Sequence, residues 1–279
     1  NRALEISRGK NRYGSCGVGF GATVERHKQK RLQLFAADLF NFKLTQQKLQ
    51  SIRSYYQDIL FRDTKYDFHR FDHDREDAQL FDDLTQLNLL CKEGVIQLAS
   101  ASYMFRKRVF CEYIFEGAQG ILLDQRCGNP PFITKSNTTS RNALRLLQQQ
   151  TSLPPEAITI SYVTRCYQTR HGNGPFEKTA VPFQLRNTRK ETNRTNEFQG
   201  VFKTAPLNIE KLNHSLSIDR RFSKACKKEL VITCLDQLKA NNIPTTSGLV
   251  NYRDIPYLLD ADFNRILFSF DACSEFIRS

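Results

Sequence analysis

The sequence predicts an α/β fold in which a mainly parallel sheet is flanked by helices. Short β-rich runs are spread over the second half of the chain, at residues 158–167, 231–238 and within 265–277, and polar or turn-forming residues end or follow each run. This order of strand, turn and helix is typical of sheets that hold ligands at the carboxyl ends of their strands. Residues 38–108 have helical rather than strand spacing, which predicts a helical insertion.

Composition limits the classes of protein to which the chain can belong. It has 279 residues, of which 40% are hydrophobic and 25% charged, enough to bury a core and unlike collagen or a coiled coil. No apolar run approaches the roughly 18 to 20 residues that cross a bilayer, and the start lacks the apolar centre of a signal peptide. We therefore expect a soluble, cytoplasmic protein without a membrane partner.

Charge and cysteine content narrow the prediction further. The formal charge of +12 favours an anionic partner such as a nucleotide, a phosphate or a nucleic acid. The eight cysteines are scattered without a CxxC pair, which argues against a zinc ribbon and favours free thiols. The chain opens with Asn1 rather than Met, which indicates a fragment, a processed product or a longer parent protein.

A glycine-spaced segment, KNRYGSCGVGFGAT at residues 10–23, precedes the basic, helix-compatible stretch VERHKQKRLQ. A loop of this kind before a helix can bind phosphate through backbone N–H groups. The same spacing occurs in ordinary tight turns, and the GxxxxGK[ST] pattern of a P-loop is absent. Both interpretations remain open from the residues alone.

The helical region contains one cluster that resembles a metal site. His69 and His73 stand four positions apart among several aspartates, a spacing that can place ligands on one helix face. The charges point all round the helix, so a solvated charged face is the favoured interpretation, and we predict no metal ligand here.

The middle of the chain holds two polar loops beside expected regular elements. Residues 109–115 predict a strand that ends in a glycine turn, with a helix start at 121–124. The hydroxyl-rich stretch KSNTTS then precedes a helix-like segment, where it can cap the helix or bind a phosphate. A turn is expected at 170–176 and a mobile polar loop at 185–204.

Several motifs, in this order, are similar to those of the adenylosuccinate synthetase family: FEGAQGILLD, PPFITKSNTT, TRHGNGPF, TNEFQGVFKTAPLN, ITCLD and SFDACSE. The pairing of EGAQGxLLD with SNTT about a dozen residues later is highly specific. The resemblance runs from about Gly14 to the C-terminus. It implies a single domain over residues 1–279, with a helical subregion at 38–108 and without the family's amino-terminal phosphate-loop segment.

The resemblance implies a carbon–nitrogen ligase of purine biosynthesis, a GTP-dependent enzyme that joins IMP to aspartate with Mg²⁺ and works as a homodimer. Gln119 resembles the family's catalytic, purine-binding glutamine. The positions similar to other purine-nucleotide contacts are Ser15, Cys16, Thr134 and His171, with Lys30 or Arg31 near the arginine that reaches the neighbouring subunit's nucleotide. Lys203 resembles the aspartate-binding arginine, and Asp236 and Ser269 resemble guanine-binding residues.

Several positions depart from the family pattern. Cys16 replaces a threonine, Lys203 replaces an arginine and loses its bidentate fork, and Cys234 replaces a lysine. The family's GDEGKGK loop, which holds Mg²⁺ and the proposed general base, has no counterpart in this sequence, so the ligands of the implied Mg²⁺ are not in this chain. These departures favour divergence within a longer parent protein.

Two other functions are weighed against the ligase. One is a catalytically inactive relative that binds purine nucleotides. The other is a basic nucleic-acid-binding module that uses the Lys and Arg surplus with 21 Phe and 10 Tyr for stacking. The aromatic residues fall mainly at apolar periodic positions, and no RRM, KH, OB or helix-turn-helix signature is present, which disfavours the nucleic-acid module.

Overall fold

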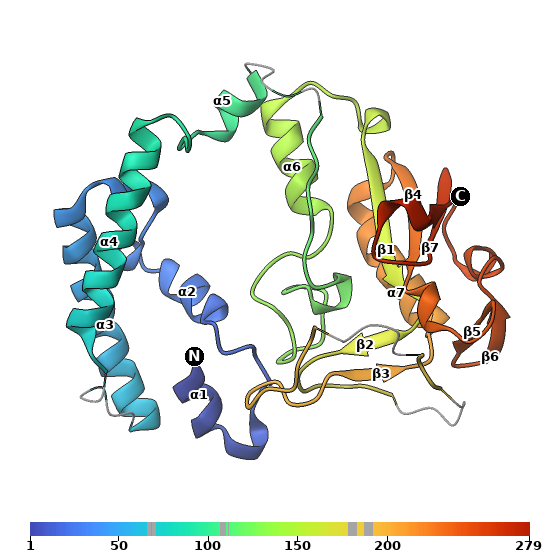
Figure 1. Ribbon diagram of the computed structural model, residues 1–279, viewed down its shortest axis with the longest axis horizontal. Helices are drawn as coiled ribbons and strands as arrows, with labels where there is room; N and C mark the ends of the chain where they lie inside the picture. The colour runs from blue at the N-terminus through green and yellow to red at the C-terminus, as the bar shows by residue number, and fades with distance from the viewer. Residues whose placement is uncertain (66–67, 69–70, 107–109, 111, 178–182, 187–191) are drawn as a thin grey trace. The chain divides into compact units, whose positions relative to one another are not determined.

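The computed structural model divides the chain into two compact units and describes residues 1–279 except 66–67, 69–70, 107–109, 111, 178–182 and 187–191 (Figure 1). The helical unit comprises Asn1–Arg12 and Cys16–Cys111, and the α/β unit comprises Tyr13–Ser15 and Glu112–Ser279. Among the helices of the described residues, none has the length and apolar character needed to span a membrane.

The helical unit confirms the expected helical region. Its helices are α1 (Arg2–Ser7), α2 (Phe20–His27), α3 (Phe42–Thr64), α4 (His73–Lys92) and α5 (Ala101–Arg106), with 3-10 turns η2 (Lys30–Leu32) and η3 (Ala36–Phe40). Side-chain caps fix where the two long helices begin. Asn41 Oδ1 accepts from the Leu44 N–H at 3.0 Å before α3, and Asp72 Oδ1 accepts from the Arg75 N–H at 3.0 Å before α4.

Charged and aromatic contacts hold α3 against its neighbours. Arg53 Nη1 on α3 donates to Asp77 Oδ2 on α4 at 2.7 Å, and this pairing lowers the pKa of the Asp77 carboxyl. The rings of Phe42 and Phe81 meet edge to face at 5.6 Å. These contacts between the two long helices supplement a sparse buried core in this unit.

The α/β unit is built on a parallel-rich sheet, as the sequence predicted. Strands β1 (Thr159–Arg165), β4 (Lys227–Thr233) and β7 (Arg265–Ser269) are parallel, and β8 (Ile277–Arg278) pairs antiparallel with β7. Two small antiparallel pairs accompany it, β2 (Gln168–Arg170) with β3 (Lys203–Ala205) and β5 (Asn242–Thr245) with β6 (Gly248–Asn251). Figure 1 shows β2 and β3 running side by side.

Helices α6 (Arg141–Gln150) and α7 (Ile209–Ser223) complete this unit, and the core lies between α7 and the sheet. Leu216 of α7 packs with Leu230 and Ile232 of β4, and Ile243 and Ile255 extend the cluster. Ile232 is fully buried, as the central parallel strand β4 requires, and Ile243 of β5 and Ile255 of the 3-10 turn η8 (Ile255–Leu258) are buried with it.

The prediction of a strand at residues 109–115 is wrong for the residues of this segment that the structure describes. Phe110 and residues 112–115 belong to no strand, and the side chain of Ile114 is 91% exposed. Strand propensity takes effect only where a neighbouring strand supplies a hydrogen-bond ladder, and no described strand pairs with this segment. The helix start expected at 121–124 is a single 3-10 turn, η5 (Ile121–Leu123).

Candidate functional site

The carboxyl ends of the parallel strands bring together residues that are far apart in the sequence. Arg165 at the end of β1 pairs with Thr233 of β4, and Ile232 of β4 pairs with Phe268 of β7. Asp236 follows β4 within η7 (Leu235–Gln237), and Ser269 is the last residue of β7. Both residues therefore lie at the edge where α/β proteins hold ligands.

The turn after β4 is fixed by Cys234 rather than by a lysine. Cys234 adopts a left-handed backbone conformation with φ 64°, and its carbonyl accepts from the Cys166 thiol at 3.1 Å. Burial raises the pKa of the Cys166 thiol, so this group stays a neutral donor. Asp236 Oδ2 accepts from Gln237 Nε2 at 2.5 Å, and Ser269 Oγ donates to the Asp271 carbonyl at 2.8 Å.

The turn after β2 packs against the glycine-spaced segment. Arg170 donates two bonds, from Nε and Nη2, to the Asn173 carbonyl at 2.9 and 2.7 Å, which closes the turn. Gly14 lies directly on this turn, since a Cβ atom at Gly14 would come within 2.4 Å of the Asn173 backbone nitrogen. Ser15, beside Gly14, is thereby placed next to the turn that contains His171.

Lys203 and His171 meet at the β2–β3 pair. Lys203 of β3 pairs with Arg170 of β2, and its Nζ donates to the Gly172 carbonyl at 3.2 Å. The His171 Nε2 lies 3.2 Å from the Gly200 carbonyl, and its ring meets the Phe202 ring edge to face at 5.8 Å. Lys203, the predicted aspartate-binding position, and His171, a predicted purine-nucleotide position, are therefore neighbours.

Thr134 lies in a loop that is anchored on a buried carboxylate. Asp124 is 2% exposed; its Oδ1 accepts from the N–H groups of Arg126 and Cys127, and its Oδ2 accepts from the Thr138 N–H at 2.8 Å. The Thr134 N–H donates to the Leu123 carbonyl at 2.8 Å. One acid thus joins the segment that follows Gln119 to the hydroxyl-rich loop.

The same loop contacts the turn after β2 through Phe132. The Arg170 guanidinium lies 6.0 Å from the centroid of the Phe132 ring, and Tyr13 meets that ring edge to face at 6.4 Å. Burial lowers the pKa of Arg170, which nevertheless remains charged at neutral pH. Phe132 therefore contacts both Tyr13, the neighbour of Gly14, and Arg170 of the turn.

Gln119 belongs to the α/β unit, whereas the basic positions belong to the helical unit. Gln119 is exposed and left-handed at φ 77°, with its side chain on the glycine turn. Cys16, Lys30 and Arg31 belong to the helical unit, where Cys16 is exposed and the other two lie in η2. The predicted set of site residues is thus divided between the two units.

Within the described residues, no group of three or more His, Cys, Asp or Glu could hold a metal ion. Of the histidine pair considered from the sequence, His69 lies outside the described residues. His73 begins α4, and its ring lies 5.1 Å from that of Phe71.

Sequence reasoning missed two residues that shape the site. Asp124 closes the SNTT loop. The sequence feature that could have indicated this role is its position as a lone acid directly after the apolar Ile-Leu-Leu run. Arg170 closes the turn on which Gly14 packs, and nothing in its local sequence indicated that its guanidinium turns back onto Asn173.

The parallel sheet, with polar groups at its carboxyl edge, defines an α/β protein of the class that holds ligands at that edge. The family model of adenylosuccinate synthetase matches residues 1–206. The chain therefore belongs to the adenylosuccinate synthetase family.

Individual relatives agree with the family model. The adenylosuccinate synthetase of Hydrogenovibrio crunogenus is 32% identical over 176 residues, which are 63% of this chain and 38% of that protein. Those of Shewanella oneidensis, 31% identical over 175 residues, and Flavobacterium psychrophilum, 29% identical over 177 residues, each match 62% of this chain and 38% of their own length. The match thus spans about two-fifths of these relatives.

Proposed function

We propose that this chain is the nucleotide- and aspartate-holding part of a ligase that joins IMP to aspartate with GTP as the phosphoryl donor. The observation that carries the proposal is the packing of Gly14, the neighbour of Ser15, against the turn at Gly172 and Asn173, to which Lys203 is also bonded. The segment proposed to bind phosphate and the cation proposed to bind the aspartate carboxylate are thus neighbours, which supports the joining of a nucleotide to an amino acid.

Each residue type suits its proposed partner. The hydroxyls of Ser15 and Thr134 donate to nucleotide phosphate oxygens, and the Gln119 amide both donates to and accepts from a purine edge. Lys203 attracts an aspartate carboxylate. The Asp236 carboxylate accepts from guanine N–H groups, beside Ser269 at the sheet edge.

In the proposed reaction, GTP phosphorylates O6 of IMP, and the aspartate amine then forms a bond to C6 as phosphate leaves. This chain's residues bind and orient the two reactants. Their fit to Mg²⁺ is poor, since the described residues contain no cluster of three possible metal ligands. We therefore assign no step of the reaction to a metal held by these residues.

We propose that the two units act together as one synthetase-like domain in a cytoplasmic homodimer. Lys30 or Arg31 of η2 would contact the phosphate of the nucleotide in the neighbouring subunit. No nucleic acid takes part in this proposal.

A second candidate is a relative that binds purine nucleotides without ligase activity. One observation favours it: the Lys203 ammonium donates to the Gly172 carbonyl at 3.2 Å, so a hydrogen bond within the fold competes with an aspartate carboxylate. Adenylosuccinate formation from GTP, IMP and aspartate decides between the two candidates.

Gln119→Ala tests the purine contact. We expect IMP affinity to fall about tenfold, because a hydrogen bond that fixes the base contributes on the order of 1 kcal/mol or more. Because the Gln119 side chain is exposed, the substitution should not affect folding, and the variant should unfold at the same temperature as wild type. Calorimetric titration with IMP measures the effect, and equal affinities in the two proteins would contradict the assignment of Gln119.

Lys203 tests the aspartate contact. Lys203→Ala should weaken aspartate binding about tenfold in the presence of IMP, since a charge-assisted hydrogen bond is worth roughly 1.5 to 3 kcal/mol. Lys203→Arg should bind aspartate at least as tightly as wild type, because its guanidinium offers a bidentate fork. If aspartate titrations of all three proteins coincide, Lys203 does not bind aspartate.

A further inference from the structure

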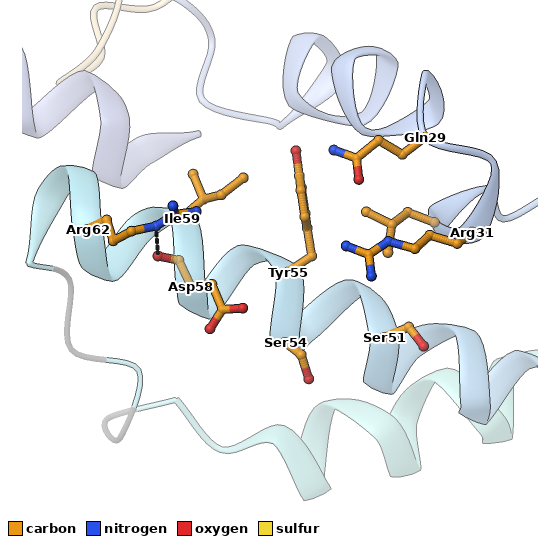
Figure 2. A pocket seen from close by; sticks show the side chains of 9 residues that line it. Gln29, Arg31, Ser51, Ser54, Tyr55, Asp58, Ile59 and Arg62 are labelled. Atoms are coloured by element: carbon orange, nitrogen blue, oxygen red, sulfur yellow. Dashed lines mark hydrogen bonds between the residues drawn. The ribbon is translucent and has the colours of Figure 1, made fainter.

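A basic pocket and a basic surface stretch lie outside the hydrophobic core. The pocket, of about 600 Å³, lies beside α3 and is lined by Arg31 and Arg62 (Figure 2), and Arg31 already has a part in the proposed ligase. The basic stretch is RRFSKACKK at residues 220–228, from the last turn of α7 to the start of β4. Five of its nine residues are Arg or Lys, none is Asp or Glu, and the proposed ligase reaction uses none of them.

The cations of the basic stretch face solvent without counter-ions. Those that are exposed are Arg220, Arg221, Lys224 and Lys227. Within the part of the chain that the structure describes, no carboxylate oxygen lies within 4.0 Å of these cations or of Lys228. The dipole of α7 favours cations in its last turn, but Lys227 and Lys228 belong to β4. Gathered like charges repel one another, and an anionic partner relieves this repulsion.

The two acids that flank the basic stretch in the sequence are engaged by other groups. Asp219 is 1% exposed and belongs to the buried side of α7. Glu229 Oε2 accepts from the Ser161 hydroxyl at 2.9 Å, and its Oε1 lies 3.9 Å from Arg265 Nη1. Neither acid neutralises the cations of the stretch, so their charge is left for a partner.

An aromatic ring lies among these cations and links them to α6. The Phe222 side chain is 37% exposed, and the Arg141 guanidinium of α6 lies 5.6 Å from the centroid of its ring. Ser140, next to Arg141, donates to Asp219 of α7, which fixes the start of α6 against the end of α7. Arg145 is exposed one turn further along α6, on the same face as Arg141. The basic stretch and these two arginines of α6 together form one basic surface.

We propose that this basic surface binds single-stranded nucleic acid, with phosphates on the cations of α6 and α7 and a base stacked on Phe222. Arginines and lysines beside an exposed aromatic ring are typical of surfaces that bind single strands. A membrane-binding surface needs several large apolar side chains that insert among the lipids, whereas residues 220–228 contain one, Phe222. The surface lies wholly within the α/β unit, and the proposal rests on no part of the ligase reaction.

The test titrates a fluorescently labelled oligouridylate of about 15 nucleotides with the full chain and follows its anisotropy at several salt concentrations. Affinity should fall as salt rises, because each neutralised phosphate releases counter-ions. Arg220→Gln combined with Arg221→Gln should weaken binding about tenfold and reduce the slope of log K against log salt by about 1.4, roughly 0.7 for each lost contact. Lys43→Gln combined with Lys92→Gln, at exposed positions of α3 and α4, removes the same charge and should leave the affinity unchanged.

Phe222→Leu separates stacking from charge, because it removes the ring and keeps apolar bulk. It should weaken the oligouridylate complex about tenfold, since a stacked base contributes to affinity on that order. The complex with an abasic strand of the same length should be unchanged, which also shows that the variant keeps the basic surface. IMP titrations report on the ligase proposal separately, since none of the exchanged residues has a part in it.

The proposal is overturned if wild type does not bind the oligouridylate, or if the double arginine variant binds it as tightly as the double lysine variant. Equal oligouridylate affinity in Phe222→Leu and wild type would also overturn it, because the surface would then attract polyanions without recognising bases. Vesicles of equal parts phosphatidylserine and phosphatidylcholine complete the test. Tighter binding to these vesicles than to the oligouridylate would assign the surface to a membrane and contradict the proposal.

Discussion

Asp219→Ala is expected to lower the free energy of unfolding of the α/β unit by about 3 kcal/mol, because it leaves several buried hydrogen-bond donors without an acceptor. Asp219 on α7 is 1% exposed. It accepts from the Ser140 N–H at 2.7 Å, from the Ser140 hydroxyl at 2.9 Å and from the Tyr162 hydroxyl at 2.6 Å. A single carboxylate thus joins the start of α6, the middle of β1 and α7.

The same network predicts a dependence on pH. Burial, and then the bond to Asp219, raise the pKa of Tyr162, so the folded protein keeps this proton when the unfolded chain loses it. A raised folded pKa gives stability that is complete below the unfolded value of about 10 and is lost as the pH rises above it. Tyr162→Phe should remove this part of the alkaline loss.

Urea denaturation followed by circular dichroism measures the effect of Asp219→Ala. Asp262→Asn, at an exposed position of the same unit, is the matched control and should stay within about 0.5 kcal/mol of wild type. An Asp219→Ala midpoint equal to that of the control would show that the buried network does not contribute as its geometry requires.

Local sequence predicted the elements whose cause is local. The predicted runs at 158–167 and 265–277 contain β1 and β7, whereas the run at 231–238 covers only the end of β4 and continues into η7. The caps at Asn41 and Asp72 explain where the long helices begin. The segment 112–115 failed because its strand character needs a partner that propensity cannot supply. The pairing of β2 with β3 was missed for the complementary reason, since three-residue strands depend on contacts distant in sequence.

For the candidate site, too, local sequence indicated single residues but not the contacts between distant ones. Motif resemblance indicated Ser15, His171 and Lys203 one by one, but their proximity arises from the packing of Gly14 on the turn at Gly172, which no local pattern predicts. The link between Ser140 and Asp219 spans 79 positions and was equally invisible. Buried acids that serve backbone donors are visible in a sequence only as carboxylates in apolar surroundings.

Asp124→Ala is expected to reduce IMP affinity more than tenfold, because it releases the three N–H groups that hold the loop between Gln119 and Thr138. Asp124→Asn separates the two functions of this carboxylate, which are to hold the local turn at Arg126 and Cys127 and to hold the hydroxyl-rich loop at Thr138. Its remaining oxygen can still accept from Arg126 and Cys127, whereas its amide NH₂ meets the Thr138 N–H as donor against donor. Asp124→Asn should therefore keep the local turn and lose the tie to the hydroxyl-rich loop.

The comparison of these variants tests whether loop position or overall stability controls binding. If position controls it, Asp124→Asn should lose most of the IMP affinity that Asp124→Ala loses while its unfolding midpoint falls less, and Asp262→Asn should change neither. Calorimetric titration with IMP and urea denaturation on the same samples provide both readouts. IMP affinity that follows stability across all the variants, Asp219→Ala included, would mean that Asp124 acts through the fold and that the loop has no separate part in holding the nucleotide.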